Sequence, residues 1–197
     1  MNIALADITA VILAGGQGRR MGGEDKGLID FNGRPLVEGL IEQLDRQGVA
    51  IAINANRNHD RYRRFGYPVI SDQLADYQGP LAGFASAMAA IDNRYILTLP
   101  CDGPVIAADY VDRFIEAAAA GDTPLAVAFD GERLQPVHAL MATALRDDLL
   151  AFLDSGDRKI DRWYAQYDYA RVDFGDCRDM FRNINTPSDK ASLQTDS

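Results

Sequence analysis

The sequence predicts an α/β fold: a single Rossmann-like, three-layer domain with a mainly parallel sheet that includes one antiparallel strand. Apolar runs of strand length alternate with segments of helical periodicity along the chain. A length of 197 residues suits one domain with a sizeable core. We see no repeat, low-complexity tract or linker, so residues 1–197 are expected to form one domain, with a polar, frayed tail at 192–197.

The expected elements follow one another in alternating type. The first strand is the apolar run at 9–13, and the helix at 35–48 shows apolar side chains at helical spacing. The other expected strands are 49–54, 69–70, 95–99, 125–129 and 137–141. The other expected helices are 58–65, 80–91, 109–120 and 143–153. The Asp130-Gly131 turn lies between the last two strands and predicts one antiparallel pair.

The loop after the first strand has the composition of a phosphate-binding loop. It reads Leu13-Ala14-Gly15-Gly16-Gln17-Gly18-Arg19-Arg20-Met21-Gly22. Glycine backbone lets amides approach a ligand closely, and successive N–H groups form an anion-binding concavity. Arg19, Arg20 and the nearby Lys26 add positive charge that can neutralise phosphoryl oxygens.

Two better-known phosphate motifs do not match this loop. In the Walker A register that starts at Gly18, Glu24 stands where the lysine would be. In the dinucleotide fingerprint, Met21 replaces the third glycine. A kinase-type ATPase and an NAD enzyme are therefore both disfavoured.

Polar residues and glycine follow the ends of four expected strands. Gly15 follows the first, Asn54 ends the second, Asp72 follows the third and Asp102 follows the fourth. Ligands of open α/β sheets bind beyond the carboxyl ends of the strands. We therefore expect these four residues to share one site.

Asp102 is the candidate metal ligand. A carboxylate at the exit of an apolar strand can bind Mg²⁺, which prefers one or two carboxylates with phosphate oxygens and water. The alternative is a cap for the turn at Pro104 or for the helix that follows. Cys101 is expected to be a packed thiol and His138 a core histidine, neither with a chemical role.

Charge and composition limit the partners. A net charge of −9 disfavours nucleic acid as the main partner. It does not disfavour a small anion, because basic residues gather locally in the stretch 17–34. The apolar stretch at 8–13 is too short for a membrane span and lacks a basic flank, so no membrane partner and a cytoplasmic location are expected.

Taken together, the motifs resemble those of nucleotidyltransferases that couple a nucleoside triphosphate to a phosphorylated acceptor, and more narrowly those of the molybdenum cofactor guanylyltransferases. The matching segments occur in the family's order over nearly the whole chain. They are 13–23, 25–27, 54–57, Asp72, 79–83, 100–102 and 183–187. The resemblance implies a nucleotide-diphospho-sugar transferase-like fold, GTP as substrate, Mg²⁺ as cofactor and molybdopterin, with or without molybdenum, as acceptor. Other molybdenum cofactor biosynthesis proteins and recipient molybdoenzymes are further candidate partners.

The resemblance also implies roles at matching positions. The expected nucleotide-binding residues are Leu13, Ala14, Gly15, Gly16, Gly18, Lys26, Asn54, Asp72 and Asp102. The expected catalytic residues are Arg19, Lys26 and Asp102, of which Asp102 holds the magnesium. One carboxylate, such as that of Asp72, can accept both the N1–H and the N2 amino group of guanine. The sister cytidylyltransferases typically carry Ala-Ala-Gly where this chain has Ala14-Gly15-Gly16, which also indicates guanine.

The acceptor is expected to contact Arg20, Gly22, Asn183 and Asn185. In the family, the segment around 183–187 borders the pterin-phosphate side of the site. From the residues alone, Thr186 and Asp189 form the pattern of a helix capping box. That interpretation leaves the two asparagines unexplained.

The expected reaction is attack of the terminal phosphate of molybdopterin on the α-phosphorus of GTP, with pyrophosphate leaving. A cytidylyltransferase for the same acceptor is the first alternative, and Gly15 and Asp72 argue against it. A sugar-1-phosphate nucleotidyltransferase usually has Thr between glycine and arginine, where this chain has Arg19-Arg20-Met21. A non-enzymatic nucleotide-binding regulator would need neither Asp102 nor Lys26.

Overall fold

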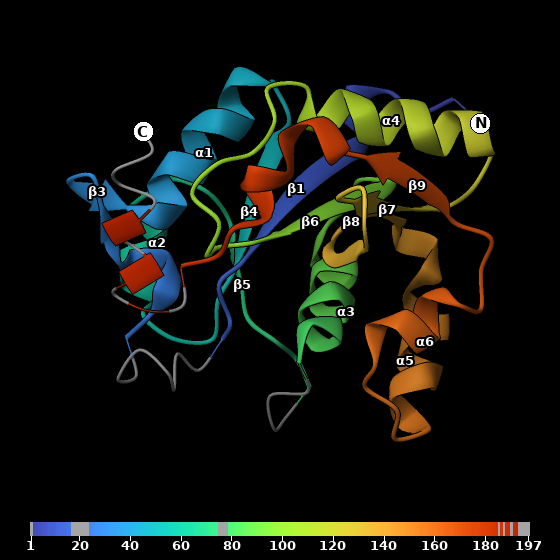
Figure 1. Cartoon of the computed structure of the whole chain (residues 1–197). Helices are drawn as coiled ribbons and strands as arrows, with labels where there is room; N and C mark the ends of the chain where they lie inside the picture. The colour runs from blue at the N-terminus through green and yellow to red at the C-terminus, as the bar shows by residue number, and fades with distance from the viewer. Residues whose placement is uncertain are drawn as a thin grey trace.

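A computed structural model describes residues 2–16, 24–74 and 79–184, together with residues 186, 188, 189, 191 and 192. Seven strands form one sheet in the order β5-β4-β1-β6-β8-β7-β9 (Figure 1). The strands are β1 (Ile8–Leu13), β4 (Ala50–Asn54), β5 (Val69–Ile70), β6 (Tyr95–Pro100), β7 (Leu125–Phe129), β8 (Leu134–Ala142) and β9 (Ala170–Asp173). A separate two-stranded ribbon is formed by β2 (Asp30–Phe31) and β3 (Arg34–Pro35).

Helices cover both faces of the sheet, which gives three layers (Figure 1). The α-helices are α1 (Leu36–Arg46), α2 (His59–Arg63), α3 (Pro80–Ala90), α4 (Tyr110–Gly121), α5 (Arg146–Asp154) and α6 (Ile160–Tyr164). Short 3-10 turns are η1 (Leu5–Asp7), η3 (Lys26–Leu28), η4 (Thr143–Leu145) and η5 (Gly175–Phe181). One core cluster joins the sheet to α1, α2 and α4, and a second joins it to α3, α5 and α6. The predicted α/β architecture is confirmed.

The strands of the sheet run in the predicted directions. β8 pairs antiparallel with both β6 and β7, whereas the remaining pairs in the sheet are parallel. The turn at Asp130-Gly131 makes the β7–β8 hairpin: the Asp130 carboxylate accepts hydrogen bonds from the backbone N–H groups of Glu132 and Arg133 at 2.9 and 2.8 Å. These bonds lower the pKa of Asp130 to about 2. Its carboxylate therefore stays ionised at neutral pH and keeps both hydrogen bonds of the turn.

Several elements were not expected from the sequence. The β2–β3 ribbon turns at Asn32-Gly33, where both residues have positive φ, as the hairpin-forming Asn-Gly pair favours. β9 and α6 are short, and β9 buries only Val172, so neither shows a usable period. The segment expected as a helix at 143–153 begins with the 3-10 turn η4 before α5.

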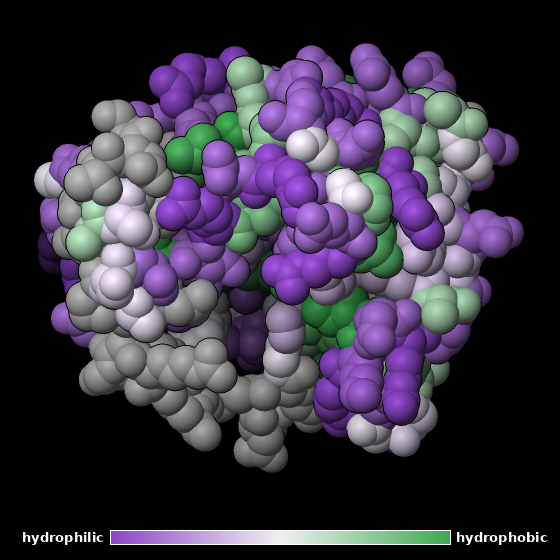
Figure 2. Space-filling view, in the orientation of Figure 1, coloured by the Kyte–Doolittle hydropathy of each residue, from purple (hydrophilic) through white to green (hydrophobic). Residues whose placement is uncertain are grey.

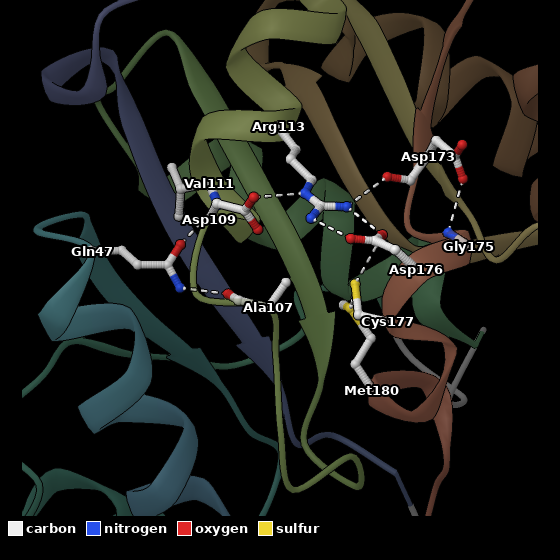
Figure 3. A network of polar contacts seen from close by, with 10 residues as sticks. All are labelled: Gln47, Ala107, Asp109, Val111, Arg113, Asp173, Gly175, Asp176, Cys177 and Met180. Carbon is white, nitrogen blue, oxygen red and sulfur yellow. Dashed lines mark hydrogen bonds and ion pairs between the residues drawn. The ribbon is translucent and has the colours of Figure 1, made fainter.

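Polar contacts fix the loop that follows β6 (Figure 3). Gln47, the residue just after α1, donates to the Ala107 carbonyl at 3.0 Å and accepts from the Val111 backbone N–H at 2.9 Å. Gln43, one turn earlier on α1, bridges the Pro104 carbonyl and the Ile106 N–H in the same way, at 3.0 and 2.9 Å. The backbone just after Asp102 is thereby attached to α1 over a long stretch.

Arg113 joins α4 to the C-terminal part of the fold (Figure 3). Its guanidinium pairs with Asp109 at 2.9 Å and binds Asp176 through two hydrogen bonds of 2.7 and 2.8 Å. These bonds raise the pKa of Arg113 and lower that of Asp176. A forked pair of this kind fixes orientation as well as distance, so η5 is held in register on α4.

None of the helices in the described ranges is long and apolar enough to cross a membrane.

His138 is a core residue, as expected, and it makes stability depend on pH. Its ring is 6% exposed and its Nδ1 lies 3.0 Å from the Tyr110 hydroxyl. Burial lowers the pKa of His138 from 6.5 to about 3. Between these values the unfolded chain binds a proton that the folded chain does not bind, so this group reduces stability as the pH falls through that window.

We predict that His138→Gln flattens the pH dependence of unfolding. The wild-type free energy of unfolding should lose up to about 1.4 kcal/mol more per pH unit than the variant between pH 6 and 4. Urea unfolding at several pH values measures this slope, with His59→Asn, a change at the chain's other histidine, as control. Equal slopes in wild type and His138→Gln would show that His138 is not buried in its neutral form.

Candidate functional site

Four strands of the sheet end at the same level. In the parallel register Leu13 pairs with both Asn54 and Pro100, and Asn54 pairs with Ile70. The pairing continues one step beyond the strands, because Ala14 N–H donates to the Asn54 carbonyl at 2.7 Å. The loops carrying Gly15, Asn54, Asp72 and Asp102 therefore leave the sheet together, as the sequence predicted.

Asn54, Asn56 and Asp72 form an amide–carboxylate cluster at this edge. Asn54 Nδ2 donates to one Asp72 carboxylate oxygen at 2.8 Å, and Asn56 Nδ2 donates to the other at 2.7 Å. The Asp72 backbone N–H returns a hydrogen bond to Asn56 Oδ1 at 2.8 Å. The Asp72 carboxylate is thereby fixed in position and in rotation.

The cluster keeps capacity for a ligand. A carboxylate has about four acceptor positions, and the two amides occupy one on each oxygen of Asp72. A ligand that presents two adjacent N–H donors can use the others.

Two glycines make room for the cluster. A Cβ on Gly15 would lie 2.8 Å from Asn56 Nδ2 and 3.3 Å from Asn54 Oδ1. A Cβ on Gly83 of α3 would lie 2.8 Å from Asn54 Oδ1. At 2.8 Å either added Cβ would force the neighbouring asparagine amide to move. Asn56 and Gly83 received no individual role from the sequence, although both fall in segments that match the family.

Lys26 and Asp102 form the second part of the site. Lys26 Nζ lies 2.9 Å from Asp102 Oδ2, and the two side chains are 24% and 14% exposed. Asp102 Oδ1 is buried and has no hydrogen-bond partner among the described residues. The capping alternative for Asp102 is therefore wrong, because its carboxylate bonds to no N–H of the turn or helix that follows.

A buried carboxylate oxygen without a partner fits a divalent cation. Leaving such an atom unsatisfied costs free energy, and a cation at Asp102 Oδ1 would satisfy it. The described residues contain no group of three or more His, Cys, Asp and Glu side chains that could hold a metal. A cation at Asp102 would therefore take further ligands from substrate oxygens and water, as Mg²⁺ commonly does.

The segment that ends at Ile184 lies against Asp102. The Ile184 N–H donates to the Asp102 carbonyl at 2.8 Å, and the Ile184 side chain is buried with Ile29 and Leu36. A Cβ on Gly103 would lie 3.3 Å from the Met180 carbonyl, so this segment passes close to the backbone after Asp102. Asn183 therefore lies beside the backbone that follows Asp102. Its Oδ1 would be 3.7 Å from a Cβ placed on Gly103.

The other predicted site residues fall into two groups. Leu13 ends β1 and Ala14 follows it into the site, and Gly16 is exposed, with no atom of the described residues, apart from its chain neighbours, within 4 Å of a Cβ placed on it. Gly18, Arg19, Arg20, Gly22 and Asn185 lie outside the described residues. The predicted capping box is present: Thr186 N–H donates to Asp189 and Asp189 N–H donates to Thr186.

Cys101 is a buried thiol. Burial raises the pKa of this thiol far above the ordinary value. The group therefore stays protonated and packs as a small apolar side chain, as expected from the sequence.

The molecular surface is hollowed near this edge of the sheet. In the orientation of Figure 1, Figure 2 shows a hollow close to where β1 and β6 end, with hydrophilic side chains along its upper side. Such a surface suits a polar, charged ligand better than an apolar one.

Comparison with known proteins gives one matching family model, the MobA-like NTP transferase domain, over residues 10–172. A protein of Shewanella halifaxensis, named molybdenum cofactor guanylyltransferase, is 50% identical over 188 residues, which are 95% of this chain and 94% of that protein.

Solved structures share the fold. Molybdopterin-guanine dinucleotide biosynthesis protein A from Archaeoglobus fulgidus matches with a TM-score of 0.76 and 20% identity, covering 95% of this chain and 97% of that one. The 4-diphosphocytidyl-2C-methyl-D-erythritol synthase of Anaerococcus prevotii matches with a TM-score of 0.73 and 12% identity, covering 97% and 96%. At these identities the likeness concerns the fold alone.

Proposed function

The chain belongs to the MobA-like NTP transferase family, as its motifs predicted, and on that premise we propose that it transfers GMP from GTP to the phosphate of molybdopterin. The products are molybdopterin guanine dinucleotide and pyrophosphate. One observation carries the proposal: a carboxylate oriented for two N–H donors and a lysine–aspartate pair lie at the same sheet edge. The carboxylate suits the guanine base, and the lysine–aspartate pair suits the phosphates of GTP.

Asp72 is proposed to select the base. Guanine offers N1–H and an N2 amino group side by side, and the two amides leave one acceptor position free on each oxygen of Asp72. Cytosine offers no such pair of donors on that edge. Asn54 and Asn56 hold the carboxylate so that binding does not have to order it.

Lys26 and Asp102 are proposed to serve the transferring phosphate. The acceptor phosphate is an anion at neutral pH, so charge repulsion and alignment limit the reaction more than proton removal. Lys26 neutralises phosphoryl oxygens and the pyrophosphate that leaves. Asp102 Oδ1 would hold Mg²⁺, which when bound supplies further positive charge to the phosphate oxygens.

The acceptor is proposed to lie on the side of Asn183. The contact between Ile184 and Asp102 supports this position, because it places the segment next to the nucleotide side of the site. Arg20, Gly22 and Asn185 remain proposed acceptor contacts. Arg19, with backbone N–H groups of Gly15, Gly16 and Gly18, is proposed to bind the triphosphate.

The wider setting follows from the same reaction. We expect one functional domain over 1–197, a cytoplasmic location, and exchange of substrate or product with other molybdenum cofactor proteins and recipient enzymes. The cytidylyl alternative shares the fold, since the Anaerococcus prevotii synthase superposes well, so base choice has to be measured.

Pyrophosphate release tests the proposed function. We predict release with GTP and molybdopterin in the presence of Mg²⁺, and little or none with CTP or after chelation of the metal. Release with CTP alone would mean that the protein selects cytosine and not guanine. No release with either nucleotide would contradict a transferase acting on this acceptor.

We predict that Asp102→Ala abolishes turnover while the protein stays folded. The change removes the proposed metal ligand and an unsatisfied buried oxygen, so melting temperature should hold within a few degrees. Asp112→Ala, at an exposed position on α4, is the matched control. Normal turnover in Asp102→Ala would remove the metal role from this residue.

We predict that Gly15→Ala lowers the preference for GTP over CTP. The added methyl would displace the Asn56 amide and with it one support of Asp72, so the ratio of kcat/KM values should fall by about tenfold or more. Gly16→Ala adds the same methyl into open space and should keep the ratio. An unchanged ratio in Gly15→Ala would separate Gly15 from base selection.

A further inference from the structure

The residue before Lys26 is a buried carboxylate with three partners. Asp25 is 3% exposed at its side chain. It accepts hydrogen bonds from the Tyr62 hydroxyl at 2.5 Å and from Asn58 Nδ2 at 3.0 Å, and Arg57 Nε lies 3.6 Å away. A buried charge is tolerated only when it is paired and hydrogen-bonded. This carboxylate is therefore held in one place.

The residue after Lys26 is fixed by the same tyrosine. A Cβ on Gly27 would lie 2.6 Å from the Tyr62 hydroxyl, so the backbone of Gly27 packs directly on that group. The Leu28 N–H also donates to the Asp25 carbonyl at 2.9 Å, which closes the turn η3 around Lys26. Tyr62 thus restrains both neighbours of Lys26.

Tyr62 is suited to this task. It is the one buried side chain of α2, whose other residues are polar and largely exposed. Its ring is fully buried, and burial raises the pKa of its hydroxyl, so the group is a hydrogen-bond donor at neutral pH. Asn58, the residue just before α2, adds the second hydrogen bond to Asp25.

Lys26 needs such restraint because its stem is long and flexible. A lysine ammonium is a point charge on four rotatable carbons, and small displacements of a catalytic group can cost large factors in rate. With Asp25 and Gly27 fixed, Lys26 extends to Asp102 at 2.9 Å. Neither Tyr62 nor Asp25 touches Asp102 or the amide–carboxylate cluster in any described hydrogen bond.

We propose that Tyr62, acting through Asp25 and Gly27, is a positioning residue that sets the Lys26 ammonium opposite Asp102. The inference rests on the proposed function for its effect on rate. Tyr62 is expected to serve the transition state and not the binding of guanine, because the base site is held by other residues.

A double-mutant cycle tests this role. Tyr62→Phe removes the hydroxyl and keeps the ring. It should lower kcat about tenfold with KM for GTP within about twofold. In a Lys26→Ala background, which already has reduced activity, Tyr62→Phe should cause no further loss, since the group through which it acts is gone. The same loss factor in both backgrounds would overturn the proposal, as would an unchanged kcat in the single variant.

Tyr67→Phe is the matched control. Tyr67 also donates to an aspartate, Asp45, at 2.6 Å, but on the surface away from the site. It should leave kcat and KM unchanged in both backgrounds. If Tyr62→Phe does not fold, Asn58→Gly removes the second donor to Asp25 while keeping the positive φ of 53° that glycine tolerates. It should show the same coupling to Lys26.

A second readout separates this proposal from the proposed function. The chain has three lysines, at 26, 159 and 190, so protein labelled with ¹³C at lysine Cε gives three signals. The Lys26 signal should shift in Tyr62→Phe and stay in place in Tyr67→Phe, whatever reaction the protein catalyses. A shift together with inactive wild-type protein would refute the guanylyl transfer alone. An unshifted Lys26 signal would refute the positioning role alone.

Discussion

The level ending of four parallel strands is the constraint on which the site depends. Leu13 lies opposite Asn54 on one side and Pro100 on the other, so β1 sets the height at which both neighbours end. A register shift of one residue in any of these pairs would turn the side chains to the other face of the sheet. Asn54 would then no longer reach Asp72, and the amide–carboxylate cluster would not form. The core that fixes this register is therefore also what aligns the site.

The two halves of the site differ in how their charges are satisfied. Both oxygens of Asp72 already accept hydrogen bonds from asparagine amides, which hold the carboxylate in one orientation. Asp102 is different, because one oxygen meets Lys26 and the other has no hydrogen-bond partner among the described residues. A satisfied cluster holds its shape before the ligand arrives. An unsatisfied buried carboxylate oxygen gains most when a cation or a donor arrives, because leaving it without a partner costs free energy.

Sequence reasoning was strongest where one residue and its neighbours along the chain suffice. It predicted the strand ends, and with them the positions of Gly15, Asn54, Asp72 and Asp102. It gave no individual role to Asn56, Gly83, Asp25 or Tyr62, because their significance lies in contacts with residues far away in the chain. Tyr62 is 37 positions from Asp25, and a single tyrosine in a polar helix resembles any core anchor. β9 was missed for a related reason: a four-residue edge strand carries too few residues to show a period.

The backbone of Asp102 links the two sides of the proposed site. Its carboxylate faces Lys26, on the nucleotide side, while its carbonyl accepts the Ile184 N–H from the segment of the proposed acceptor side. The side chain of Ile184 packs with Ile29, three residues after Lys26, so Ile184 contacts Asp102 through its backbone and the segment after Lys26 through its side chain. In-line transfer requires donor and acceptor phosphates to be aligned within a fraction of an ångström. When one residue connects both sides through its own backbone, that alignment is a property of the fold and needs no separate ordering of two distant loops.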